Sequence, residues 1–358
     1  MASPSDLPIV LYHYNLSPFA KRVVWYLNLR KIPYSQCLQP RIMPRPDLNL
    51  LGVSYRRIPV LSIGRDVYLD TRLIIQKLEA LYPPSAAHPG ISSSGSAGGR
   101  PEHAALEQLI SARTIEGQLF KSFVQCLPKS TFSDPALLRD RAALNGVDVD
   151  KPGAVAPLSP EALAKVRPEA LAVAHRWVRW LEEGLLSDGR TWILDSNAGG
   201  SGPSLADIEA VWVLHWVSGF PGALPAEILS AESAPKVFAW IKRFSEAVKE
   251  AAKGAPATPS LKGEEAAKLI VGAPFAQPEG EVLRGDPIVE GLGLLKGGGV
   301  KVWPTDYGFS HKDVGKLVAV DDKEFVIEAK GDFGTVRIHA PRHGFTISKH
   351  DENVTSKI

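Results

Sequence analysis

Cysteine is scarce in this chain: among its 358 residues only Cys37 and Cys126 are cysteines. They lie in separate predicted segments and form no C-x-x-C pair, so the sequence excludes a disulfide framework and favours a reducing compartment. The sequence has no run of about 20 apolar residues, and Met1 to Pro8 lack the charged-then-apolar layout of a signal peptide. We therefore expect a cytoplasmic protein that makes no use of a membrane.

Charge of one sign is not in excess either. Lys and Arg number 41 and Asp and Glu number 39, which gives a formal net charge of +2. No global field then attracts nucleic acid, and any anion site has to be local. Basic side chains near the end of the chain suggest an RNA-binding barrel, but acidic ones interleave with them, so we interpret this surface as solvated and expect no nucleic-acid partner. The basic residues are Lys316, Lys330, Arg337, Arg342 and Lys349.

Zinc, P-loop and Rossmann patterns and internal repeats are also missing, and the nine histidines show no metal-ligand spacing. The composition, with 44% hydrophobic and 22% charged residues, is typical of a globular protein. A chain of this length predicts two or three domains. We expect a multidomain α+β protein.

The first 88 residues have the pattern of a small α/β layer. An apolar run at 7–12 precedes helical spacing at 18–31, a second apolar run lies at 58–63, and Val67 to Leu69 follow a turn. A helix at 71–81 comes next, before a double proline. The order βαβ, then ββα, predicts a thioredoxin-like α/β N-terminal domain over 1–88.

Residues 83–101 have the Pro, Ser, Gly and Ala content of a linker. The pattern beyond it predicts an all-α second domain over 101–255, in which 128–158 form an irregular insertion with at most short helices. A second linker, Gly254 to Lys262, leads to a region over 263–358. There a short helical piece precedes five β-type runs, which predict a small β-barrel-like C-terminal domain, SH3-like or a sandwich. The expected helices are 102–127, 160–186, 204–216 and 235–253, and the expected strands 300–303, 315–320, 325–329, 335–339 and 345–348.

Chemistry is concentrated at the start of the first helix, where Ser17 precedes Pro18. Serine at the cap and proline at the first helical position is a common structural arrangement. A helix N-terminus also gathers free N–H groups and a positive dipole end, which favour an anion. A thiolate held by the Ser17 hydroxyl is such an anion, and each unit by which its pKa falls from about 8.5 corresponds to about 1.4 kcal/mol.

Two further segments fit an extended peptide ligand. Pro59 stands where thioredoxin-like folds place a cis proline, which leaves the backbone of Ile58 to pair with the ligand. Arg57, just before, suits a ligand carboxylate. Asp70 and Thr71 open the next helix, where a carboxylate and a hydroxyl bind an α-amino group and a carboxylate together. Taken separately, Pro59 is also a common strand-starting residue and Asp70 an ordinary helix cap.

Together these segments resemble the glutathione site of serine-type glutathione transferases: Ser17 to Val23 (SPFAKRV), Arg57 to Leu61 (RIPVL) and the pair Asp70-Thr71. The resemblance implies that Ser17 is catalytic and activates the thiol of glutathione, the co-substrate. It also implies that Ile58 and Pro59 bind the cysteinyl backbone, that Asp70 and Thr71 bind the γ-glutamyl end, and that Arg57 binds the glycine carboxylate. Phe19 belongs to the same substrate-binding set.

The second domain resembles the same family, because Ser204 to Ile208 (SLADI) is similar to the S-x-A-D-I signature of its core helix. We expect a capping box there, with a role in folding. By resemblance, Arg113 and Phe120 on the first helix of this domain line a pocket for a hydrophobic electrophile. Helical spacing leads us to interpret Trp177, Trp180, Trp212, Trp216 and Trp240 as packing residues.

Three alternatives stay open. Asp70-Thr71 replaces the commoner Glu-Ser of the family, which shortens one side chain and crowds the other. Tyr12 and Tyr14 lie near the end of the first strand, where tyrosine-type transferases place their activating hydroxyl, although the position before Pro18 favours Ser17. Besides conjugation, the same site suits a glutathione-dependent isomerase or a non-catalytic binding or regulatory protein. The family implies a homodimer, and the β-rich C-terminal region resembles tails of some fungal transferase-like proteins.

Overall fold

The computed structural model describes residues 6–93, 100–194 and 202–350. Its N-terminal part follows the predicted α/β order closely, and helix α1 begins at Pro18 with Ser17 as its cap. The centre of the predicted linker, residues 94–99, and Met1 to Ser5 lie outside the described residues. The elements are β1 (Ile9–His13), α1 (Pro18–Leu29), β2 (Ser35–Leu38), α2 (Pro46–Asn49), β3 (Val60–Ile63), β4 (Asp66–Leu69) and α3 (Thr71–Leu81).

The described part of residues 100–254 is helical, as predicted. The single helix expected at 102–127 is instead two helices, because Gln118 adopts a left-handed φ of 59° and interrupts the hydrogen-bond ladder. Gly117 suits this break, since a Cβ there would come within 2.5 Å of the Arg113 carbonyl oxygen. The elements are α4 (Pro101–Ile115), α5 (Leu119–Gln125), the 3₁₀ turn η2 (Lys129–Phe132), α6 (Pro135–Leu144), α7 (Pro160–Trp180), the π-helical turn η3 (Leu181–Leu185), α8 (Leu205–Val217) and α9 (Pro235–Gly254).

Helix α8 begins with the predicted capping box. The Asp207 carboxylate accepts from the Ser204 backbone N–H at 2.9 Å, and it also accepts from Trp240 Nε1 at 2.8 Å. Trp177, Trp212 and Trp240 are buried, in agreement with a packing role. Trp180 stacks on Trp177 with ring centroids 4.9 Å apart, but the residue is 44% exposed.

Residues 263–350, here called the C-terminal module, contain all five predicted strands. The helix α11 was not expected from the sequence, and it ends at Gly293 with a left-handed φ of 57°. No helix in the described ranges combines the length and the apolar character that crossing a bilayer requires. The elements are α10 (Gly263–Gly272), α11 (Pro287–Leu292), β5 (Gly299–Pro304), β6 (Asp313–Val320), β7 (Glu324–Lys330), β8 (Thr335–Pro341) and β9 (Phe345–Lys349).

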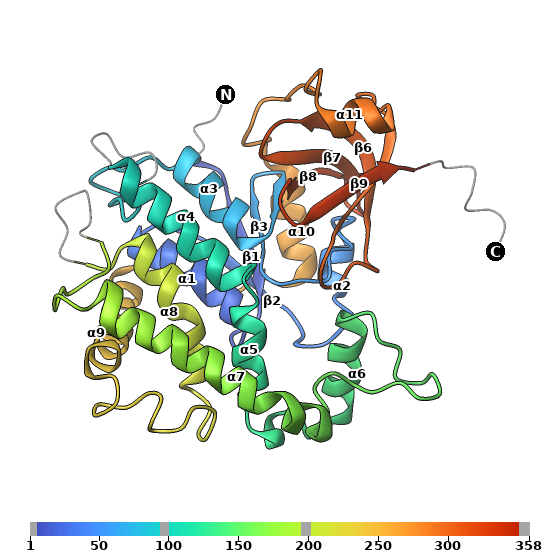
Figure 1. Ribbon diagram of the computed structural model, residues 1–358. Helices are drawn as coiled ribbons and strands as arrows, with labels where there is room; N and C mark the ends of the chain where they lie inside the picture. The colour runs from blue at the N-terminus through green and yellow to red at the C-terminus, as the bar shows by residue number, and fades with distance from the viewer. Residues whose placement is uncertain (1–5, 94–99, 195–201, 351–358) are drawn as a thin grey trace.

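The strands of the module continue the N-terminal sheet, which the sequence did not predict. Strand β8 pairs in parallel with β4, placing Val67 opposite Ile338, and the full order is β2-β1-β3-β4-β8-β7-β6-β5-β9. Without this pairing β4 would present unpaired N–H and C=O groups at a sheet edge. The module therefore satisfies the backbone of the thioredoxin-like part and forms one nine-stranded sheet with it (Figure 1).

The two faces of the N-terminal strands lie in different cores. Ile9 and Leu11 of β1 pack with α1 and the helical region, whereas Val10 and Tyr12 pack with α10 and the strands of the module. Successive side chains of a strand point to opposite faces, so this alternation follows from the strand itself. Figure 1 shows the result, with α1, α8 and α9 on one side of β1 and β3 and the module on the other.

A buried group of charges lies where β4 meets β8. His339 Nε2 lies 2.8 Å from Asp66 Oδ1, and His339 Nδ1 lies 3.1 Å from Glu324 Oε2. Lys77 of α3 donates to Glu324 Oε1 at 2.5 Å. Burial works to lower the pKa of His339, but the two carboxylates together raise it above its usual value. The pair of carboxylates thus favours the protonated form of this imidazole between the N-terminal part and the module.

This arrangement predicts a stability that depends on pH. Because the folded-state pKa of His339 is raised, its contribution is fully present below the unfolded pKa of about 6.5 and is lost as the pH rises through the folded pKa. We expect His339→Gln to lower the free energy of urea-induced unfolding most at about pH 6, with a smaller difference from the wild type at about pH 9. His175→Gln, at an exposed position of α7, is the control and should change little at either pH. An equal loss for His339→Gln at both values would contradict a charged imidazole.

Candidate active site

Ser17 lies at the N-terminus of α1, on the helix that joins β1 to β2. Its side-chain oxygen accepts a hydrogen bond from the Ala20 backbone N–H at 3.2 Å, and Pro18 occupies the first helical position. The hydroxyl proton of Ser17 is therefore left to donate to another group. Only 2% of Ser17 is exposed. A sulfur atom placed against this hydroxyl would stand in a water-poor position beside the first-turn amides of α1.

The segment before β3 has the expected backbone form, since the Ile58–Pro59 peptide bond is cis. Ile58 is 8% exposed. Arg57 does not point its donors to open solvent. Its Nε donates to the Tyr307 carbonyl oxygen at 2.8 Å, and its Nη2 is paired with the Asp306 carboxylate, both of the C-terminal module. The residue predicted to bind the glycine carboxylate is thus already bound to a carboxylate of the protein.

Asp70 caps α3 in an unusual conformation. Its φ is 65° and its ψ is 134°, a region that residues other than glycine rarely adopt and that recurs at functional sites. The Asp70 carboxylate accepts from the Arg72 N–H at 2.9 Å and lies 3.8 Å from His343 Nε2. Burial works to raise the pKa of Asp70, but His343 and Arg72 hold it well below its usual value. The carboxylate is therefore ionised at neutral pH and suited to a cationic ligand group.

Thr71 contacts a buried ion pair that joins the N-terminal part to the helical region. Arg22 of α1 donates to Thr71 Oγ1, and its guanidinium is also paired with Glu209 of α8. Both side chains are buried. Because Thr71 Oγ1 accepts from Arg22, its own proton is directed to another acceptor, such as a ligand carboxylate.

The two tyrosines considered as alternatives to Ser17 differ in position. Tyr12 is fully buried in the core shared with the module, and burial raises the pKa of its hydroxyl far above the usual value. Tyr14 is partly exposed, and the Arg45 guanidinium lies 6.0 Å from the centre of its ring. Tyr12 is thus unsuited to stabilise a thiolate, while the Tyr14 backbone carbonyl accepts from the Ser17 N–H at 3.0 Å.

The structure brings Phe19 and Phe120 together. Their ring centroids are 4.8 Å apart, and Trp212 of α8 packs against both, at 4.7 Å from Phe19 and 5.3 Å from Phe120. Trp216, one helical turn further along α8, adds to the cluster at 5.4 Å from Phe120 and is partly exposed. An aromatic wall therefore begins two residues after Ser17 and continues into the helical region.

Arg113 is placed elsewhere. It lines an open, mainly polar groove of about 710 Å³ between α4, α5 and α7, and neither Ser17 nor Phe120 lines that groove. Arg72 connects the groove to the cap of α3, because its guanidinium pairs with Glu116 at the end of α4. In the described ranges, no group of three or more His, Cys, Asp or Glu side chains is arranged to hold a metal ion.

Several residues near the site were not predicted. Arg45, 6% exposed, follows a second cis bond at Met43–Pro44, and burial together with Arg141 and Arg56 lowers its pKa to about 10. Asp306 and His343 come from loops of the module, about 250 and 270 residues along the chain from Arg57 and Asp70. No local pattern in the sequence indicates that these loops return to the first domain.

Comparison with known proteins finds a matching N-terminal domain and similar folds. A family model described as "Glutathione S-transferase, N-terminal domain" matches residues 11–86, and one described as "Domain of unknown function (DUF7962)" matches residues 123–253. A GST-like protein from Pseudomonas syringae has a similar structure, with a TM-score of 0.64 and 21% sequence identity over 96% of this chain and 99% of that one. A rice glutathione transferase in complex with glutathione has 18% identity over 74% and 96%, with a TM-score of 0.47. No curated protein sequence matches the chain.

The fold and the N-terminal match define a thioredoxin-like domain joined to a helical one, with a strand-rich C-terminal region. Residues 11–86 thus match the N-terminal domain of glutathione S-transferases, and the whole chain has a glutathione transferase-like fold.

Proposed function

We propose that the protein is a serine-type, glutathione transferase-like enzyme that activates the thiol of glutathione for attack on a hydrophobic electrophile. The observation that carries this proposal is the Ser17 hydroxyl, which accepts from the Ala20 N–H and keeps its proton for a sulfur at the tip of α1. Ile58 and Pro59 would align the cysteinyl backbone, and Asp70 and Thr71 would bind the γ-glutamyl end. Phe19 and Phe120 would form the wall against which the electrophile lies.

The reaction then needs neither a metal nor a covalent enzyme intermediate. Glutathione loses its thiol proton to solvent, and the hydrogen bond from Ser17 and the first-turn amides of α1 stabilise the thiolate. The sulfur forms a bond to the electrophilic carbon of a haloarene, and the halide leaves with the electron pair of the broken bond. Holding both reactants against the aromatic wall contributes proximity.

Incubation with glutathione and a panel of enones and haloarenes tests this proposal. Conjugation consumes thiol and releases halide from haloarenes, whereas a glutathione-dependent isomerase rearranges the enone with no net loss of thiol. Binding of glutathione in calorimetry without turnover on any member of the panel would instead favour a binding or regulatory protein. The contacts of Arg57 and Asp70 with the module are the observation in favour of that second function.

Asp70 provides a direct test of the γ-glutamyl subsite. We expect Asp70→Asn to weaken glutathione binding about tenfold, because a hydrogen bond between two charged groups becomes one to a neutral amide. Asp134 is a matched control, since its carboxylate also caps a helix and accepts from the Ala136 N–H at 2.9 Å. Calorimetry measures the affinity of both variants for glutathione. If Asp70→Asn binds glutathione as tightly as the Asp134 control does, Asp70 does not belong to the site.

The proposal extends to features that the family implies. We propose a cytoplasmic homodimer, with domains at 1–88, 101–255 and 263–358. Light scattering at several protein concentrations tests the dimer, and a monomer throughout would contradict it.

A further inference from the structure

A loop of the C-terminal module pairs with Arg57, the residue predicted to bind the glycine carboxylate of glutathione. Residues 305–312 connect β5 to β6 and are here called the β5–β6 loop. Asp306 of this loop pairs with Arg57 Nη2, and the Tyr307 carbonyl oxygen accepts from Arg57 Nε at 2.8 Å. The guanidinium of Arg57 is thereby supplied with a carboxylate and a carbonyl oxygen from the same loop.

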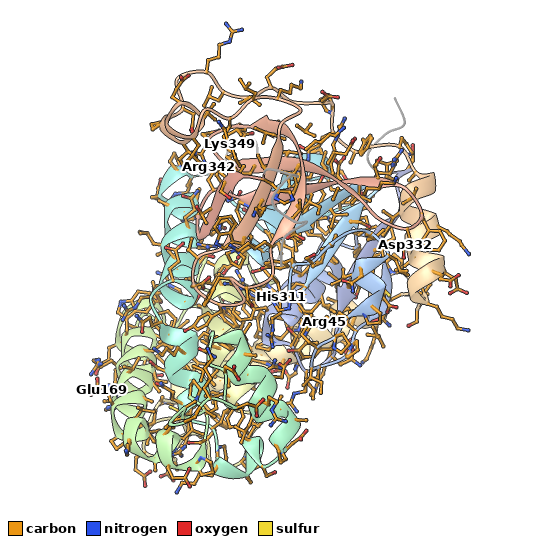
Figure 2. All side chains as sticks on the ribbon, turned by 90° about the vertical axis from the view of Figure 1, so that its right-hand side faces the viewer. Arg45, Glu169, His311, Asp332, Arg342 and Lys349 are labelled. Atoms are coloured by element: carbon orange, nitrogen blue, oxygen red, sulfur yellow. The ribbon has the colours of Figure 1, made fainter. Side chains whose placement is uncertain are left out.

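Other contacts hold this loop against the end of α6 and against Arg45. The Gly308 N–H donates to the Leu144 carbonyl oxygen at 2.8 Å, at the end of α6. Phe309 packs so closely on Gly146 that a Cβ there would come within 2.4 Å of its ring. His311 lies beside Arg45 (Figure 2), and burial followed by the charges of Arg56 and Arg45 lowers its pKa. The loop therefore bridges the N-terminal part and the helical region.

The Asp306–Arg57 pair is nevertheless open to exchange. The side chain of Asp306 is 53% exposed and that of Arg57 23% exposed. Exposed ion pairs contribute little net stability, since both charges keep part of their hydration. A ligand carboxylate approaching Arg57 would have to displace a carboxylate of similar charge or remain beside it, at an electrostatic cost.

The module also approaches the opposite end of the site. His343, in the turn between β8 and β9, lies 3.8 Å from the Asp70 carboxylate, which is the predicted partner of the ligand amino group. Its Nε2 is buried and has no hydrogen-bond partner among the described residues. Both charged ends of the predicted glutathione site therefore face groups from the same C-terminal module.

We propose that Asp306 is a specificity-determining residue that makes the site favour γ-glutamyl thiols whose distal end carries no negative charge. This inference rests on the proposed function. Glutathione itself ends in a carboxylate. Asp306 repels this carboxylate and competes with it for Arg57. An amide or ester at that end lacks the charge and can accept from Arg57 without removing Asp306, because the guanidinium has five donors.

The test compares glutathione with its glycine amide as ligands in calorimetry, for the wild type and for Asp306→Asn. We expect the wild type to bind the amide about fivefold more tightly than glutathione, the size of effect that one exposed ion pair supports. Asp306→Asn should bind glutathione about fivefold more tightly than the wild type does, with the affinity for the amide unchanged. Asp306→Ser should give the same pattern.

Asp322→Asn is the control, because it removes the same charge from an exposed turn of the module at the opposite end of β6. It should leave both affinities unchanged. If the wild type binds glutathione and Asp306→Asn leaves the ratio of the two affinities as it was, this inference is overturned and the proposed function stands. If neither thiol binds to any of the proteins, the proposed function is overturned together with it.

Discussion

Replacing Ser17 with alanine should lower kcat for conjugation about 100-fold, the usual effect of removing one hydrogen-bond donor from a developing or existing anion. The Ser17 side chain is placed to donate because its hydrogen bond with the Ala20 N–H uses a lone pair of the oxygen and leaves the hydroxyl proton for another group. Without it, the pKa of bound glutathione should return towards the ordinary thiol value of about 8.5. Thiolate absorbance in the ultraviolet, followed against pH, measures that pKa, and steady-state kinetics measure kcat.

A matched serine separates this role from helix capping. Ser159 caps α7 with the same geometry, since it precedes Pro160 and accepts from the Ala162 N–H at 3.2 Å. Ser17→Ala and Ser159→Ala should each cost about 1 kcal/mol of stability as lost caps. Only Ser17→Ala should affect the thiol. If Ser17→Ala keeps the kcat of the wild type, Ser17 is a cap and nothing more, and Tyr14 becomes the next hydroxyl to test.

The second large effect is expected at Glu209. Replacing it with glutamine leaves the buried guanidinium of Arg22 without its carboxylate, and breaking such a pair from one side costs about 3–5 kcal/mol. Arg22 also donates to Thr71 Oγ1 and lies 5.4 Å from the centre of the Trp212 ring. Urea-induced unfolding measures the loss, and glutathione affinity should fall with it because Thr71 loses its support.

Two further variants show whether the loss at Glu209 comes from the unpaired charge of Arg22. Glu250→Gln removes a carboxylate from an exposed pair with Lys253, whose side chains are 70% and 73% exposed, and should change stability by less than about 0.5 kcal/mol. The double variant Arg22→Met with Glu209→Leu removes both buried charges and should recover most of the stability. A cost below about 1 kcal/mol for Glu209→Gln would mean that water or another group compensates Arg22.

Much of the fold was accessible from local patterns. Strands and helices with a clear period and a cap, such as α3 behind Asp70 or α8 behind Ser204, lie where the sequence predicts them. The cis bond before Pro59 was also predicted correctly, because the segments around it fix its place in a thioredoxin-like order. These features depend on neighbours within about ten residues, which a single sequence displays.

What the sequence did not predict depends on contacts across the chain. Nothing near β4 indicates that its partner is β8, since strand pairing in parallel carries no local signal. For the same reason Arg57 was assigned to a ligand carboxylate while the structure places Asp306 beside it. Arg113 shows a different limit: the break at Gln118 alters the direction of the chain after α4, and helical spacing alone cannot give the resulting face.

The shared core on the module side of β1 has a consequence for how the protein is made. Val10 and Ile58 leave the ribosome early, but Ile338 and Ile347, which belong to the same core, are synthesised some 280 or more residues later. Domains usually fold as they emerge, the N-terminal one first. Here one face of the first sheet stays uncovered until the C-terminal module has been synthesised.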